Sequence, residues 1–191
     1  MLATNHALLG MCVSIAINHR GKTTSSRKMR ALAVSAPLLA VASHFTLDPV
    51  PHFGGTAWYQ DTSPVFPLVL AVDGLLTLTA IAITSWMSYG RDHKRGNVLR
   101  IIICGCAATS PDALFLLRNR GVPLDWWFYR FHEGIQWYEH PSGGLVELCF
   151  MIGMSLLILR HFKTRPTEVT MRSKANDKKP QVAAREQMLV A

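Results

Sequence analysis

The stretch VFPLVLAVDGLLTLTAIAITSW, residues 65–86, contains twenty-two residues and a single charged side chain, that of Asp73. About 20 predominantly apolar residues in a helix are enough to cross the ~30 Å hydrocarbon core of a bilayer. Its apolar residues form one long uncharged run and do not follow the spacing of a helix with one buried face, which favours lipid as the solvent. The stretch therefore predicts a transmembrane α-helix.

Four further apolar runs accompany it, at residues 2–17, 31–47, 101–117 and 145–159. The first, second and last are shorter than the ~20 residues of a full span, so they need local thinning of the bilayer or help from flanking residues. The sequence predicts an all-α integral membrane helical bundle of about five spans. We expect one transmembrane domain over residues 1–160 and a disordered, basic, cytoplasmic tail over residues 161–191.

The basic residues decide the expected orientation of these spans. The chain has a formal net charge of +8, and seventeen of its twenty Lys and Arg residues follow the first, third and fifth runs. Connections rich in Lys and Arg stay in the cytoplasm, so we expect the N-terminus outside and the C-terminus inside a bacterial inner membrane. The first run lacks a basic segment before it, so we expect it to be retained as a span and not cleaved as a signal peptide.

Several function classes are disfavoured by the composition. All four cysteines, Cys12, Cys104, Cys106 and Cys149, lie in apolar runs, where cysteine behaves as a small hydrophobic residue, so no disulfide framework or thiolate metal site is expected. The basic tail has no accompanying nucleic-acid motif. We therefore expect it to contact membrane lipid and do not expect it to bind nucleic acid.

Ionisable residues collect toward the predicted outer side of the membrane. An ionisable side chain at the centre of a span costs roughly 2.5–3.5 kcal/mol on insertion scales, and a shared partner offsets that cost. His44 and Asp48 are four residues apart, hence on one helical face, just before Pro49. Imidazole nitrogens and carboxylate oxygens on facing helices are typical ligands of zinc or a similar divalent cation. The predicted ligands are His6, His44, Asp48, Asp112 and His132, with His52 as a further ligand or a proton shuttle.

The second outer connection contains DWWFYRFHEGIQWYEH, residues 125–140. Its Trp, Phe and Tyr residues indicate a short amphipathic segment at the level of the lipid headgroups. This segment could cover the metal site, supply His132 as a ligand and supply Glu133 as a catalytic base. Anchoring the chain in the interface, with no part in a site, is the alternative.

Four stretches resemble a known family: ATNHALLG at residues 3–10, SHFTLDPVPHF at 43–53, PDALF at 111–115 and FHEGIQWYEHPSG at 131–143. They are similar to small bacterial membrane proteins allied to the YdjM-type membrane-bound metal-dependent hydrolases, and the likeness covers most of residues 3–150. The resemblance implies a helical membrane protein with a divalent-metal site. The family also shows an HRGxTHS stretch, and in HRGKTTSS, residues 19–26, Thr24 stands where its second histidine belongs.

Two functions remain open at this point. The first is metal-dependent hydrolysis of an ester or phosphoester, with a lipid-like molecule as the substrate. The second is a non-catalytic scaffold or metal-handling protein whose His/Asp cluster is structural. Hydrolysis predicts an open coordination position, whereas a scaffold predicts a closed, fully paired cluster. The serine-hydrolase, HExxH and phosphate-binding-loop motifs are all absent from the sequence.

Overall fold

The computed structural model describes residues 2–20, 26–50, 63–92, 95–123, 127–135 and 142–164. These residues form six α-helices and no strand, so the all-α fold class is confirmed. Each of the five apolar runs lies within one long helix, and the sixth helix lies in the aromatic segment. The helices are α1 (Ala3–Arg20), α2 (Ser26–Leu47), α3 (Phe66–Asp92), α4 (Arg95–Asn119), α5 (Trp127–Ile135) and α6 (Gly143–Thr164).

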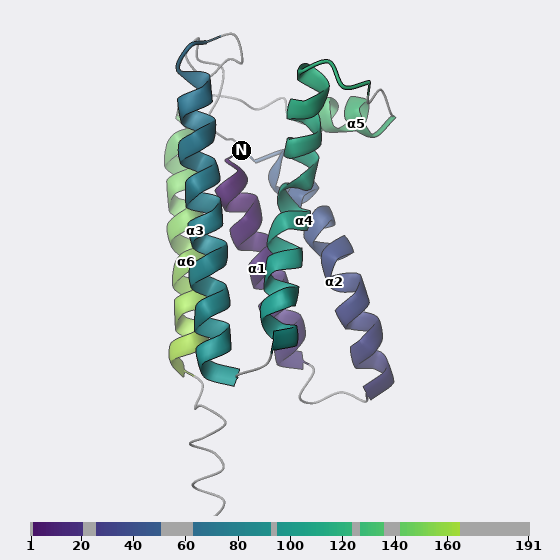
Figure 1. Ribbon diagram of the computed structural model, residues 1–191, viewed down its shortest axis with the longest axis vertical. Helices are drawn as coiled ribbons and strands as arrows, with labels where there is room; N and C mark the ends of the chain where they lie inside the picture. Colours follow the sequence, from purple (N-terminus) through teal and green to yellow (C-terminus); the bar gives the residue numbers. More distant parts are fainter. Residues whose placement is uncertain are drawn as a thin grey trace, which may run out of the picture.

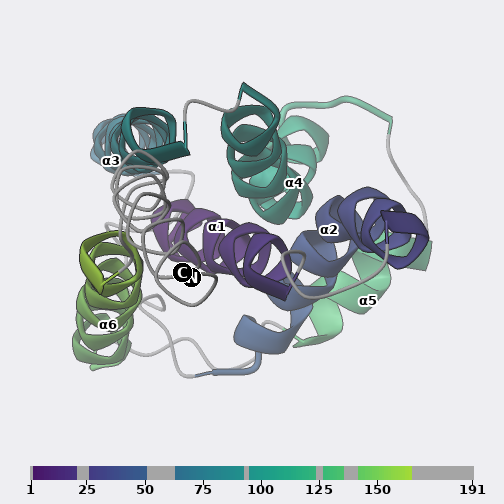
Figure 2. The same ribbon diagram turned by 90° about the horizontal axis from the view of Figure 1, so that it is seen from below.

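The five long helices run alternately up and down, and the short helix α5 lies near the upper end (Figure 1). Helix α1 is the centre of the bundle, with α2, α3, α4 and α6 arranged around it (Figure 2). It contributes buried apolar side chains to both core clusters, including Met11 and Ile17. The central position of α1 explains how a helix with three buried polar residues in its first turn fits into an apolar bundle.

Small residues bring α1 and α4 into close contact. A Cβ atom added at Gly10 would lie 2.4 Å from the carbonyl oxygen of Cys104 and 2.7 Å from the Cβ of Ala108. Such approach of two backbones over small residues is a common way to pack membrane helices, where no hydrophobic force drives helices together. Gly10 therefore sets the distance between the two helices that carry His6 and Asp112.

Three helices, α3, α4 and α6, are long and apolar enough to cross a membrane. Helices α1 and α2 contain shorter apolar stretches, Ala3–Ile17 and Val34–Leu47. Large apolar side chains are exposed along the outer faces of the bundle, among them Val34, Leu68, Leu75, Leu78, Trp86, Leu145 and Leu156. A continuous apolar exterior of this kind indicates contact with lipid or with another protein.

The upper end of α1 is held by two buried carboxylates from neighbouring helices. Asp73 of α3 accepts the backbone N–H groups of Ala3 at 2.8 Å and of Thr4 at 3.1 Å, and the Thr4 hydroxyl at 2.6 Å. Glu147 of α6 accepts the N–H of Leu2 at 3.2 Å. The first N–H groups of a helix have no partner within it, and negative charge is favoured there, so both carboxylates act as caps. Asp73 thus receives hydrogen bonds from a neighbouring helix, which offsets the cost of burying its carboxylate.

The lower end of the bundle receives the basic connections. Helices α1, α3 and α6 end there, and α2 and α4 begin there (Figure 1). Near this end Arg91 donates from Nη1 to the carbonyl of His161 at 3.0 Å and lies 5.8 Å from the centre of the Phe162 ring. The described helix ends that flank the Lys- and Arg-rich segments therefore lie at the same end of the bundle. Helix α6 continues to Thr164, and the predicted tail beyond it lies outside the described residues.

Candidate metal centre

His44 is oriented by a backbone carbonyl of α4 in the turn before Pro111. Pro111 has no N–H to offer the carbonyl of Ala107, which accepts the Ser110 hydroxyl at 2.8 Å instead. The next carbonyl, that of Ala108, lies 2.8 Å from Nδ1 of His44. A carbonyl can only accept, so Nδ1 carries the proton and Nε2 carries the lone pair. This outer hydrogen bond fixes the ring of His44 in the tautomer that a metal ligand requires.

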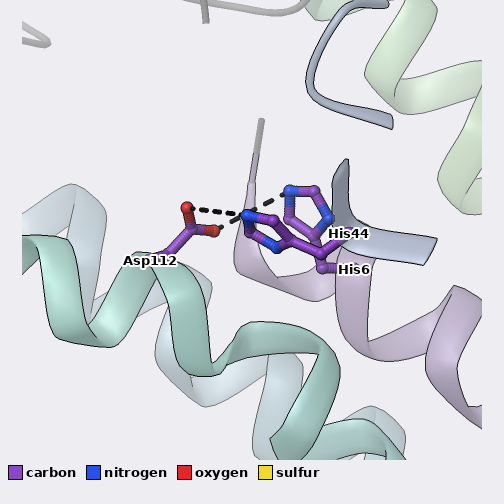
Figure 3. A group of neighbouring side chains, drawn as sticks. All are labelled: His6, His44 and Asp112. Atoms are coloured by element: carbon purple, nitrogen blue, oxygen red, sulfur yellow. Dashed lines mark ion pairs between the residues drawn. The ribbon is translucent and has the colours of Figure 1, made fainter. Parts of the chain in front are cut away.

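The structure brings all five predicted ligands together near the upper end of the bundle. They come from α1, from α2 and the turn that follows it, from α4 and from α5. His6, His44, Asp48 and His132 are fully buried, while the side chain of Asp112 is 21% exposed. Two sets offer ligand atoms within 4.8 Å of one another, namely His6, His44 and Asp112, and His44, Asp48 and His132. The rings of His6, from α1, and of His44, from α2, face the carboxylate of Asp112, from α4 (Figure 3).

Four of the ligand atoms form a compact group. Nε2 of His44 lies 3.0 Å from Nε2 of His132, and both nitrogens lie 3.2 Å from Oδ2 of Asp48. Both also lie 3.6 Å from Oδ1 of Asp112. Zinc binds nitrogen and oxygen at about 2.0–2.1 Å, so neighbouring ligands of a tetrahedral site are about 3.3–3.4 Å apart. These five distances, 3.0–3.6 Å, are close to the separations between ligands of a tetrahedral zinc site.

His6 completes the cluster from α1. Its ring stacks on that of His44 with the ring centres 3.8 Å apart and the planes 28° from parallel. Its Nε2 atom lies 3.4 Å from Oδ1 of Asp48 and 3.7 Å from Oδ2 of Asp112. His6 thus adds a third imidazole beside the two carboxylates.

Asp48 is buried without any hydrogen bond from the described part of the chain to either carboxylate oxygen. Burial alone would raise the pKa of this carboxyl, but the facing imidazoles of His132 and His44 outweigh it and hold the pKa of Asp48 below its usual range. His6 also lacks a hydrogen bond at both ring nitrogens within the described residues. Buried polar atoms left without partners cost free energy, and a cation bound between them would remove that cost.

An apolar groove of about 330 Å³ lies elsewhere in the bundle, between α3 and α6. Thr4 and Leu8 of α1 are among the residues that line it. Residues of a helix are about 100° apart, so His6 points away from Thr4 and Leu8. The groove is therefore separate from the His/Asp cluster, which approaches the surface at Asp112.

Two predicted catalytic residues cannot be placed. His52 lies outside the described residues, and Glu133 belongs to α5, but its side chain is not among those described. The orienting role of the Ala108 carbonyl was not foreseen from the sequence. The only signal for it is Pro111, because a proline within a helix frees carbonyl groups in the preceding turn.

Comparison with protein-family models, with curated proteins and with solved structures found no match to this chain.

Proposed function

We propose that this protein is a multi-pass membrane protein that binds divalent metal, with zinc as the best fit, through His44, His132, Asp48 and Asp112. The observation that carries the proposal is the convergence of imidazole and carboxylate groups from separate helices into two overlapping sets that share His44. Burying these groups in an apolar bundle is costly unless they share a partner. Two nitrogen and two oxygen ligands suit zinc better than the oxygen-preferring Mg²⁺ or Ca²⁺.

The proposed location of the centre is the outer leaflet of a bacterial inner membrane. The described helices alternate in direction, and the helix ends next to the basic segments lie opposite the cluster. Lys- and Arg-rich connections remain in the cytoplasm, so the basic end of the bundle would face the cytoplasm and the cluster would face outward. Five spans with the N-terminus outside and the C-terminus inside give this arrangement. Helices α1 and α2 would cross with short apolar stretches in a locally thinned bilayer.

The proposed activity is hydrolysis of an ester or phosphoester, with a lipid headgroup as the natural source of substrate at this depth. A water oxygen would bond to the carbonyl carbon or the phosphorus, the bond to the alkoxide would break, and the water proton would end on that alkoxide. The metal would lower the pKa of the water, and the partial exposure of Asp112 supports a route to it. The resemblance to YdjM-type hydrolases supports the same activity, with His52 and Glu133 as the proposed proton carriers.

A structural role for the cluster is the second candidate, and burial is the observation that favours it. Four of the five ligands are fully buried, as in a metal site that only fixes helix packing. The protein would then bind metal with no open position and have no hydrolytic activity.

Metal analysis tests the centre itself. Protein purified in detergent and dialysed against zinc is expected to retain zinc after gel filtration, whereas His44→Ala and Asp48→Ala are expected to lose it. Ser14→Ala, a change at a buried polar residue of α1 that is no ligand, is the matched control and should retain metal. Equal zinc content in the wild-type protein and both ligand variants would remove the basis of the proposal.

Hydrolysis requires a separate assay. The protein is reconstituted in phosphatidylglycerol and phosphatidylethanolamine vesicles, and released headgroups or fatty acids are measured by mass spectrometry. Release that needs zinc and is absent in His44→Ala supports the hydrolase. Zinc binding without any release favours the structural role.

Cysteine labelling tests the orientation. In a chain with its four native cysteines replaced by alanine, Val122→Cys is expected to react with an impermeant thiol reagent added to whole cells. Gly96→Cys, at the start of α4, is expected to react only after permeabilisation. Both positions are exposed, and nothing lies within 4 Å of a Cβ at Gly96. The reverse labelling pattern would invert the proposed topology.

A further inference from the structure

The two carboxylates of the cluster each face two different sets of imidazole nitrogens. Oδ2 of Asp48 lies beside His44 and His132, whereas its Oδ1 lies 3.4 Å from Nε2 of His6. Asp112 repeats the pattern, with Oδ1 toward His44 and His132 and Oδ2 at 3.7 Å from Nε2 of His6. Both carboxylates are therefore positioned as bridges between two places where a cation could be held.

We propose that the cluster holds two divalent cations, with the second one bound by Nε2 of His6, Oδ1 of Asp48 and Oδ2 of Asp112. This inference depends on the proposed metal centre and adds a second ion to it. Carboxylate bridges usually connect metal ions about 3.5–4 Å apart. A single tetrahedral ion uses four ligands, and these are already supplied by His44, His132 and one oxygen of each aspartate, so His6 is left over.

His6 supports the second ion independently of that count. It is fully buried, and neither of its ring nitrogens has a hydrogen-bond partner among the described residues. A buried histidine that serves only packing normally finds such a partner. Its stacking on His44 turns Nε2 toward both carboxylates. A cation between these three atoms gives that nitrogen the partner it lacks.

The two ions would differ in coordination. The first has four protein ligands and resembles a structural zinc site, while the second has three and leaves a position for water, as in catalytic zinc sites. Within the described residues the cluster contains two carboxylates against four positive charges of two divalent ions. The excess positive charge favours an anion in the open position, either hydroxide or a phosphate oxygen. The second ion thus favours a phosphoester over a neutral carboxylic ester as the substrate class.

Counting metal ions per chain tests the proposal. Protein stripped with a chelator, titrated with zinc and gel-filtered is expected to hold two zinc ions per chain, measured by mass spectrometry against amino-acid analysis. His6→Phe keeps an aromatic ring to stack on His44 but has no ligand nitrogen, and it should hold one. Ser14→Ala on the same helix is the control and should hold two.

The outcomes separate this inference from the proposed function. One ion per chain in both the wild-type protein and His6→Phe overturns the second ion and leaves the first. No ion in the wild-type protein overturns both proposals, and loss of both ions in His6→Phe overturns the division into two centres. Because zinc is silent in electron paramagnetic resonance, the protein is also loaded with Mn²⁺. Spin coupling between two ions is expected in the wild-type protein and in Ser14→Ala, and it should be absent in His6→Phe; its absence in the wild-type protein contradicts a bridged pair.

Discussion

Two pairs of carboxylates lie toward the upper end of the bundle, and they differ in what surrounds them. Asp73 and Glu147 accept backbone N–H groups at the start of α1. Asp48 and Asp112 face imidazole nitrogens, and Asp48 has no hydrogen bond to either oxygen from the described residues. The first pair is stabilised by the backbone itself. The second pair lies among imidazole rings, which is the arrangement that the proposed metal centre uses.

The surroundings of these four carboxylates indicate their roles more clearly than the residue type does. All four are acidic residues in or next to apolar helices, and each alone signals a polar group at membrane depth. Only the surroundings distinguish a helix cap from a metal ligand. The following variants test that distinction, from the largest expected effect to the smallest.

Asp48→Asn is expected to cause the largest change. The substitution removes the charge of a residue whose two oxygens face all three imidazoles. Loss of an outer partner of a metal ligand weakens affinity roughly 10–100-fold, and loss of this ligand should exceed that range. Zinc affinity measured by competition with a fluorescent chelator checks it, with Asp73→Asn as the paired control. Equal affinity in the two variants would contradict the distinction between the pairs.

Asp73→Ala is expected to destabilise the bundle and leave metal binding intact. The change removes the acceptor of two backbone N–H groups and one hydroxyl at the start of α1. The Thr4 hydroxyl keeps the Asp73 carbonyl and Thr77 as partners. Each buried donor left without a partner costs about 1–3 kcal/mol, so loss of the acceptor of the two N–H groups should lower the free energy of unfolding by roughly 2–6 kcal/mol. Unfolding of metal-free protein in mixed micelles, followed by circular dichroism, measures this loss. An unchanged unfolding curve would show that the cap contributes nothing.

Gly10→Ala is expected to have an intermediate effect on both properties. The added methyl group would lie 2.4 Å from the Cys104 carbonyl oxygen, so α4 must move away from α1. Overpacking of this kind costs about 1–3 kcal/mol, and it also draws Asp112 away from His6. Gly153→Ala on α6, with nothing within 4 Å of its Cβ, is the matched control. Both variants are compared by unfolding and by zinc affinity, and identical behaviour of the two would refute the close contact.

Glu147→Gln is expected to have the smallest effect. A glutamine side chain keeps an oxygen that can accept the N–H of Leu2, and only the charge at the helix N-terminus is lost. Such a charge is worth about 0.3–1 kcal/mol. The same unfolding measurement should detect a small shift, with zinc affinity unchanged. A loss of zinc affinity would place Glu147 with the metal ligands and break the comparison.

Much of the fold could be predicted from the sequence because lipid imposes a simple rule. A spanning segment must satisfy its backbone internally, so long uncharged runs indicate helices, and each of the five runs lies within one. Helix α2 ends at Leu47, just before Asp48 and Pro49, as expected from the inability of proline to continue a helix. The number of spans and their orientation remain predictions, because the helices are known by length and composition alone.

The sequence predicted which residues form the candidate site, but it did not predict how they are arranged. Depth along each span groups His6, His44, Asp48 and Asp112, because residues at matching distances from one membrane face lie at one level. Sequence does not show how far each helix is rotated, so the stacking of His6 on His44 and the two-sided use of both carboxylates appear only in three dimensions. The roles of Asp73 and Glu147 depend on rotation in the same way.

Helix α5 has nine residues, fewer than the ~12–15 at which an isolated helix becomes stable in water. Its inward contacts include His132, at 3.0 Å from His44, and the ring of Phe131, whose centre lies 5.5 Å from that of Phe45. A cation that binds His132 would thus fasten a surface segment to the buried ends of α2 and α4. Removal of the ion from the proposed centre would then loosen the hold of α5 on the bundle.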